Sequence, residues 1–153
     1  MNELWRQQVQ TPDAETAFVV DCFGRRLTLA ARNARQTLDS HLARAGTTYA
    51  GWSVLATLHQ QGPLMQRELA QRLDIEGPTL TRQLERLERQ GLVTRRRVDS
   101  DRRVALVELT PSGQAMVSQL QEVVAVAAKE VGAGLTTEQL QELGSLLDLI
   151  TAR

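Results

Sequence analysis

The chain has 153 residues, with 18 basic and 18 acidic side chains, 42% hydrophobic residues, two His and one Cys. This length suits one compact domain, or one domain with long helical arms, and permits a core without disulfides or metal. One Cys excludes an internal disulfide, and one Cys with two His argues against a Cys/His zinc site. No signal segment and no run of 18 apolar residues occurs. We therefore expect a soluble, cytoplasmic protein without a metal or cofactor and without a membrane partner.

Positive charge is concentrated in one part of this neutral chain. Residues 77–103 hold eight Arg against four acidic residues, Glu85, Glu88, Asp99 and Asp101. A local surplus of this kind is what a phosphate-binding surface needs, even on a protein with zero net charge.

A long amphipathic helix is predicted over residues 13–45. Thr11 as N-cap and Pro12 at the first helical position mark its start. Apolar residues then recur at steps of three and four along it. A second helix is predicted over residues 48–61, where Gly62 and the Pro that follows it end the apolar pattern.

The next two predicted helices have the spacing of a helix-turn-helix. A short helix over residues 66–73 is followed by a turn over 74–78. A further helix over 78–90 begins with Pro78, and Gly91 ends it. Two helices joined by so short a turn are typical of a helix-turn-helix unit.

A hairpin and two more helices complete the predicted elements. Residues 92–98 and 104–109 alternate in the manner of strands, and residues 99–103 form the turn between them. Thr110-Pro111 begins a helix to about Val131, and the capping-box spacing of residues 136–139 begins the last one. The predicted fold is mainly α with a small β hairpin (α+β).

The helix predicted over residues 78–90 separates its side chains by kind around its axis. At about 100° per residue, three leucines share one side and three arginines the other. The apolar side consists of Leu80, Leu84 and Leu87. The opposite side carries Arg82, Arg86 and Arg89, with Thr79 and then Gln83 on the flank between them and the leucines, and the two acids on the other flank. A helix that enters the major groove needs this arrangement. A solvated helix with internal charge pairs is the alternative for this segment by itself.

The predicted hairpin has the position of the wing in a winged-helix domain. Its turn holds Arg102 and Arg103, with Asp101 beside them. Arginine on a narrow tip can reach the minor groove, and a neighbouring carboxylate can fix its rotamer. Taken alone, residues 99–103 also fit a charged, solvated turn.

These motifs together resemble the MarR family of bacterial transcriptional regulators. The residues that carry the resemblance are 66–70, 77–82, 84–93, 101–103 and 107–110. The match extends over nearly the whole chain, and the Gly-Pro-Thr-Leu-Thr-Arg and Ser-Asp-Arg-Arg motifs are closest to the SlyA branch. The resemblance implies a single domain over 1–153, with a winged helix-turn-helix DNA-binding lobe over 48–110 and dimerisation helices over 1–47 and 111–153.

The function that the resemblance implies is regulation of transcription, as a repressor, by sequence-specific binding to double-stranded DNA. A homodimer would read a palindromic operator, with recognition helix 78–90 in the major groove and wing 99–103 in the minor groove. Met65 stands where the family often has Ser or Thr as the cap of the helix at Gln66. The residues expected to contact DNA are Gln66, Pro78, Thr79, Thr81, Arg82, Gln83, Arg86, Asp101, Arg102 and Arg103.

The resemblance also raises the question of a regulatory signal. Members of the family respond to small aromatic acids and phenolic compounds or to oxidants. Tyr49, Trp52 and His59 lie on or near the helix that lines the effector pocket in this family, and they are also ordinary core residues. Cys22-Phe23 resembles the organic-peroxide-sensing branch, whose tyrosines bind the thiolate, but Tyr49 is the only Tyr here. The other interpretation of Cys22 is a small buried hydrophobe in the dimer interface.

Two other classes of function have weaker support in the sequence. A winged helix that binds protein in place of DNA would tolerate acids on the recognition face, whereas here the acids lie to one side. An enzyme is not expected, because the chain lacks a Gly-rich phosphate loop, a nucleophile elbow and an HExxH motif. His41 and His59 lie on different predicted helices, where they fit solvated or partly buried positions.

Overall fold

The computed structural model describes the backbone of residues 14–98 and 101–151, and the side chains of residues 22–96 and 105–151. The chain forms two compact units, Met1–Gln36 and Thr37–Arg153. Helix α1 (Ala14–Arg44) begins in the first unit and ends in the second, in agreement with the predicted long helix. The helix start expected at Thr11 and Pro12 lies outside the described residues.

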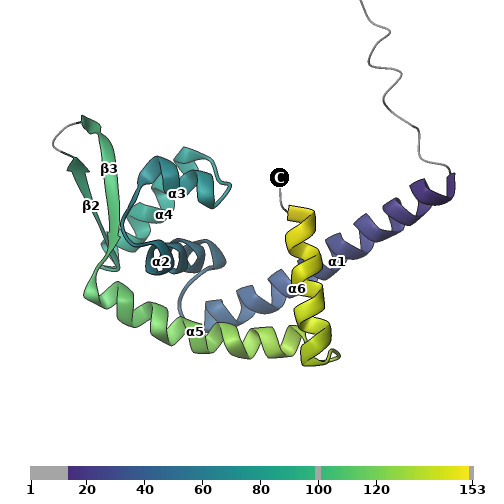
Figure 1. Ribbon diagram of the computed structural model, residues 1–153. Helices are drawn as coiled ribbons and strands as arrows, with labels where there is room; N and C mark the ends of the chain where they lie inside the picture. The colour runs from purple at the N-terminus through teal and green to yellow at the C-terminus, as the bar shows by residue number, and fades with distance from the viewer. Residues whose placement is uncertain (1–13, 99–100, 152–153) are drawn as a thin grey trace, which may run out of the picture. The chain divides into compact units, whose positions relative to one another are not determined.

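Five further helices form in the second unit, each within one or two residues of its prediction. They are α2 (Tyr49–Gln61), α3 (Gln66–Arg72), α4 (Gly77–Arg89), α5 (Pro111–Val131) and α6 (Thr137–Thr151). The predicted capping box of α6 is confirmed, since Thr136 Oγ1 accepts from the Gln139 N–H and Gln139 Oε1 accepts from the Thr136 N–H. Figure 1 shows α5 passing along α2, with the hairpin beside α3 and α4. No helix in the described ranges is long and apolar enough to cross a membrane.

A three-stranded antiparallel sheet of order β1-β3-β2 stands beside these helices. Its strands are β1 (Leu64–Met65), β2 (Val93–Val98) and β3 (Asp101–Leu109). The hairpin prediction is confirmed, but the turn predicted over 99–103 is too long, because β3 already begins at Asp101. Strand β1 was not predicted, since two residues carry no readable alternation; it forms by pairing Leu64 with Val107 and Met65 with Leu106.

The hydrophobic core lies inside the second unit. It contains residues from both helices of the helix-turn-helix and from all three strands of the sheet. Leu80, Leu84 and Leu87 of α4 are at most 1% exposed, so the predicted apolar stripe is confirmed. Leu69 of α3 is equally buried, and Leu42 brings the end of α1 into the same cluster. The other buried hydrophobic residues of the cluster are Val54, Leu55, Leu58, Leu64, Leu92, Val93, Val107, Val117 and Leu120.

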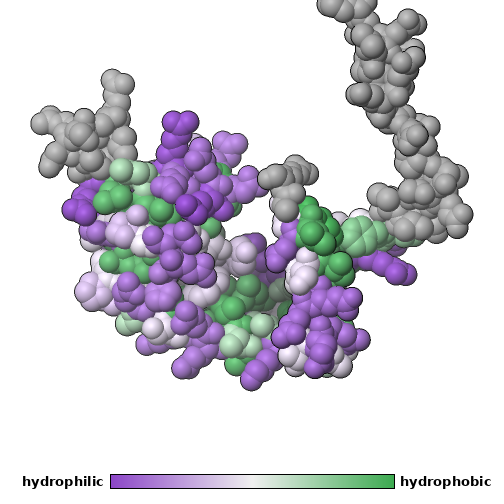
Figure 2. Space-filling view, in the orientation of Figure 1, coloured by the Kyte–Doolittle hydropathy of each residue, from purple (hydrophilic) through white to green (hydrophobic). Residues whose placement is uncertain are grey.

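Large hydrophobic side chains also remain exposed, and their distribution is uneven. Among the described residues, all of these exposed side chains lie on α1 or in the segment from α5 to α6. They are Phe23, Leu29, Val126, Val131, Leu135, Leu140, Leu143, Leu146, Leu149 and Ile150. Figure 2 shows this apolar surface on the upper part of α6. Helix α6 has no buried residue at all in the single chain.

Candidate nucleic-acid interface

The exposed side of α4 is basic and hydroxyl-bearing, as its sequence predicts. Arg82, Arg86 and Arg89 are exposed, as are Pro78 and Thr79 at the start of the helix. The long apolar residues on the other side anchor α4 in the core, so these cations cannot turn inward without breaking the packing. The helix therefore presents positive charge and hydrogen-bond donors on one continuous face.

Gln66 and Thr81 join α3 to α4. Gln66 Nε2 donates to Thr81 Oγ1 at 2.9 Å, and Thr81 Oγ1 donates to the carbonyl of Gly77 at 3.0 Å. The two side chains thus hold the first turn of α4 against the start of α3. Met65 occupies the N-cap of α3 and makes no side-chain hydrogen bond there. This agrees with the sequence, in which Met stands where the family often has a capping Ser or Thr.

Gln83 is expected to face DNA, and its position is less open than that of the arginines beside it. It is only partly exposed, and its Oε1 is buried without a hydrogen-bond partner among the described residues. In this conformation the acceptor end of the amide points into the lobe. The sequence did not indicate this, because a wheel angle near the edge of the apolar stripe leaves the side-chain direction undecided.

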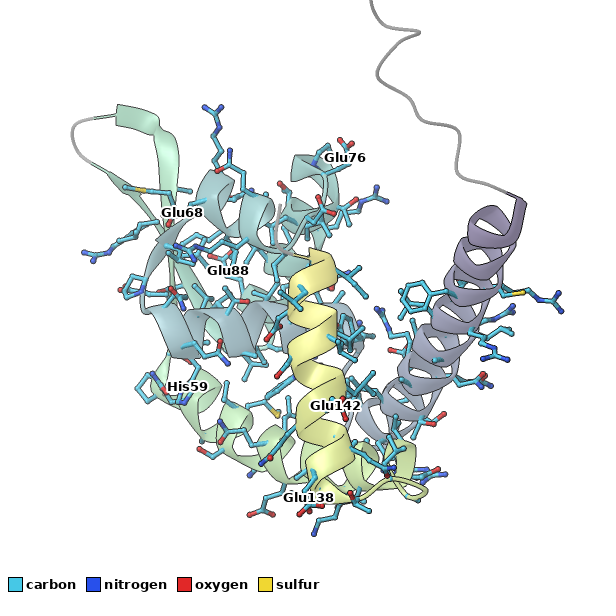
Figure 3. All side chains as sticks on the ribbon, turned by 45° about the vertical axis from the view of Figure 1, so that its right-hand side comes forward. His59, Glu68, Glu76, Glu88, Glu138 and Glu142 are labelled. Carbon is cyan, nitrogen blue, oxygen red and sulfur yellow. The ribbon has the colours of Figure 1, made fainter. Side chains whose placement is uncertain are left out.

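A hollow of about 860 Å³ opens between the helix-turn-helix and the hairpin. The turn that borders it contains Asp74 in the left-handed region, with φ of 50°. Glu76, at the N-cap of α4, lies at the edge of the lobe in Figure 3. The lining residues are Gln66, Arg67, Ala70, Gln71, Asp74, Ile75, Glu76, Gly77, Thr81 and Ala105. The surface beside α4 is therefore concave and mixed in charge.

The hairpin directs successive arginines to opposite faces. Arg95 pairs with Glu88 of α4 at 2.6 Å, whereas Arg96 pairs with Glu108 of β3 at 3.5 Å. The hydrogen bond and charge of Arg95 hold the pKa of Glu88 below its usual value. Arg95 therefore faces α4, whereas Arg96 faces the neighbouring strand. The pair with Glu88 was not predicted, because α4 and β2 meet only in the folded chain.

The wing residues are placed by their backbone alone. Asp101 pairs in register with Val98, which puts Asp101, Arg102 and Arg103 at the end of β3 nearest the hairpin turn. The register shifts between Arg97 and Val98, so the hairpin is irregular next to its tip. The side chains of these three residues lie outside the described part.

The three residues predicted for an effector pocket have different environments. Tyr49 and Trp52 are half-buried and pack against the core cluster. His59 is exposed, and its Nδ1 lies 3.0 Å from Oε1 of Gln114 on α5. Figure 3 shows His59 on the outside of the helices. None of the three lines the hollow described above, which borders the helix-turn-helix instead.

Cys22 lies in the first unit, where it is half-buried on α1. His41, which belongs to the second unit, places Nε2 at 2.7 Å from Oε2 of Glu130, so that the end of α1 is tied to α5. The contact with Glu130 fits a structural role for His41.

Comparison with known proteins gives the same architecture. The MarR family model matches residues 47–105. A mutant MarR from E. coli complexed with operator DNA aligns with 86% of this chain and 95% of its own, at 27% identity and a TM-score of 0.78. A probable transcriptional regulator from Pseudomonas aeruginosa aligns with 86% of this chain and 98% of its own, at 25% identity and a TM-score of 0.76.

A third structure shares the fold at lower identity. BpsR from Bordetella bronchiseptica, whose DNA binding is regulated by 6-hydroxynicotinic acid, aligns with 84% of this chain and 98% of its own. The identity is 24% and the TM-score 0.78, so this likeness concerns the fold.

Proposed function

We propose that this chain is a transcriptional regulator of the MarR family, which binds double-stranded DNA sequence-specifically and represses transcription. The carrying observation is the division of α4 into a leucine side that is at most 1% exposed and an exposed side with Arg82, Arg86 and Arg89. This helix follows α3 in a helix-turn-helix and precedes a hairpin, which is the order of a winged-helix reader.

In the proposed complex, α4 enters the major groove and the wing over residues 99–103 enters the minor groove. Arg82, one turn into α4, reaches a base edge or the phosphate beside it, and Arg86 follows one turn later. Thr79 and Pro78 let the start of α4 approach the sugar-phosphate backbone of the DNA closely. Gln66 and Thr81 support the helix through their mutual hydrogen bond.

On the wing, Arg103 and Arg102 are proposed to contact the minor groove, with Asp101 holding the arginine rotamer. Readout there depends on groove width and potential, which favour an inserted arginine. The Asp-x-Arg motif at the start of β3 supports this role.

We propose that the functional form is a homodimer built by residues 1–47 and 111–153, with residues 48–110 as the DNA-binding lobe. The exposed hydrophobic residues of α1, α5 and α6 support this division, because apolar patches of that kind usually mark an interface. The two α4 helices would then occupy successive major grooves, with half-sites about 10 base pairs apart.

Three finer proposals rest on the family resemblance. The motifs over residues 77–82 and in the wing favour the SlyA-like branch of the family. We place the protein in the cytoplasm, because a bacterial regulator must reach the chromosome there. A small aromatic acid is the proposed effector class. Salicylate at millimolar concentration should weaken operator binding by favouring an arm spacing that misfits the half-sites; unchanged affinity would reject this effector class.

Footprinting on the intergenic DNA upstream of the protein's own coding sequence tests the main proposal. We expect two protected half-sites, which should need a higher protein concentration in Arg82→Ala and be unchanged in Arg26→Ala, which removes an exposed arginine of α1 instead. Protection that survives Arg82→Ala at wild-type affinity would reject α4 as the reader. Binding to no DNA, together with an intact fold, would favour the alternative in which the winged helix binds protein.

A further inference from the structure

Glu88 and Arg95 form a close ion pair between the recognition helix and the wing. Arg95 donates from Nη2 at 2.6 Å and from Nε at 3.1 Å, both to Oε2 of Glu88. The arginine side chain is 24% exposed and the glutamate side chain 39% exposed. Glu88 lies at the C-terminal end of α4 (Figure 3), so the pair spans two elements that the proposed complex places in different grooves.

The pair lies where the hairpin leaves the core. Arg95 shares its strand face with Val93, which is 1% exposed, and stands opposite Val107, which is fully buried. Two positions nearer the hairpin tip on β3, Ala105 borders the hollow. Among the described side chains, the inward face of the wing is therefore packed into the core at Val93 and Val107 and borders the hollow at Ala105.

The neighbouring arginine acts within the sheet. Arg96 points to the outward face and pairs with Glu108, a residue of the adjacent strand. Thr94 also contacts Glu108, at 3.4 Å. These contacts join β2 to β3, whereas the contact of Arg95 joins β2 to α4. On the other edge of the sheet, β3 is held by β1.

We propose that Glu88 and Arg95 are a positioning pair that fixes the wing relative to the recognition helix and acts on DNA binding through the wing. This inference rests on the proposed DNA-binding function for its consequence, but not for its first test. If the pair is broken, the hairpin can move about its base at Val93, and the wing no longer meets the minor groove in register with α4.

Hydrogen exchange of the free protein tests the positioning role without DNA. Glu88→Gln and Arg95→Gln should each speed exchange of the hairpin amides beyond Thr94 by about two- to fivefold, the range expected for a partly exposed ion pair. Glu85→Gln is the matched control, because it removes an exposed carboxylate from the same helix. The charge-reversed double variant Glu88→Arg with Arg95→Glu should restore slow exchange. Hairpin exchange in Glu88→Gln equal to that of Glu85→Gln would overturn the proposal.

Operator footprinting tests the consequence. Each Glu→Gln change removes one negative charge near the phosphates, so a pure charge effect would strengthen binding equally in both variants. The positioning role predicts that Glu88→Gln loses protection in the minor groove flanking each half-site, while Glu85→Gln keeps it. If hairpin exchange is faster but protection of the flanks is unaltered, the pair positions the wing only in the free protein. That outcome would refute its action on DNA binding. Absence of DNA binding in the wild type would reject the proposed function but leave the exchange result standing.

Discussion

Thr110 joins three elements through its side-chain hydroxyl and its backbone N–H. Its Oγ1 donates to the carbonyl oxygen of Gly91 at 2.6 Å and accepts from the N–H of Gly113 at 3.0 Å. Its own N–H donates to the carbonyl of Leu92 at 3.1 Å. The end of α4, the end of the wing and the start of α5 therefore meet at this residue.

Replacing Thr110 by Val should lower the free energy of unfolding by about 1–2 kcal/mol. The isosteric side chain can neither cap α5 nor donate a hydrogen bond to the carbonyl oxygen of Gly91. Chemical denaturation measures the change. Ser112→Ala, an exposed position in the same turn, should change stability by less than about 0.5 kcal/mol. Equal stability of Thr110→Val and the wild type would show that the hydrogen bonds contribute nothing net.

Gly113→Ala should destabilise the protein more strongly, by about 3 kcal/mol or more. A Cβ at Gly113 would overlap the backbone carbonyl oxygen of Leu92, which cannot move without disturbing the contact with Thr110. Gly134→Ala is the control, since a Cβ there meets no atom within 4 Å. Thermal unfolding of the two variants should differ clearly; similar melting temperatures would show that the α4–β2 junction adapts.

The Glu88–Arg95 pair should make part of the stability dependent on pH. Because the Arg95 hydrogen bond lowers the pKa of Glu88 from its usual value of about 4.5, the folded state favours the ionised form. The contribution is fully present above the unfolded pKa and is lost as pH falls through the lower, folded pKa. The stability difference between wild type and Glu88→Gln should therefore be largest above pH 5 and shrink in acid. A difference that grows on acidification would contradict this sign.

Arg82→Ala and Arg103→Ala should impair DNA binding in different ways. If Arg82 contacts a base, its loss should cost about 1–3 kcal/mol and relax preference at one position per half-site. Arg103→Ala should weaken all sequences more evenly and lower the salt slope by about one for each phosphate that is no longer neutralised. Competition binding against substituted operators at several salt concentrations separates the two. Wild-type affinity in Arg103→Ala would reject the wing contact.

Asp101→Ala should resemble Arg103→Ala in a weaker form, since it frees the arginine without removing its charge. The double variant should lose less affinity than the sum of the two single variants, because the residues act as a unit. A double-mutant cycle on operator binding measures this coupling. Strict additivity would reject the pairing of Asp101 with Arg103.

Deleting residues 136–153 should give a monomer or an insoluble protein with weak operator binding. The exposed leucines of α6 motivate this expectation, since Leu140, Leu143 and Leu146 are 43–51% exposed in the single chain. Sedimentation at micromolar concentration provides the measurement. A wild-type chain that sediments as a monomer would reject the dimer itself.

The amino-acid sequence by itself determined the long elements and the basic face of α4. Leucines at Leu80, Leu84 and Leu87 recur at helical spacing, so the side that faces the core follows from local geometry. Pro78, Gly91 and Thr110 mark the ends of their elements for equally local reasons. The family resemblance then added roles for wing residues that no periodicity could assign.

The tertiary structure decided which distant residues meet. Strand β1 exists because Leu64 and Met65 pair with Val107 and Leu106 far along the chain, and two residues have no period of their own. The pairing of Glu88 with Arg95, the link between Gln66 and Thr81, and the inward Oε1 of Gln83 likewise depend on how α3, α4 and β2 pack. Side-chain direction near the edge of an apolar stripe is set by neighbouring elements, and sequence spacing does not contain that information.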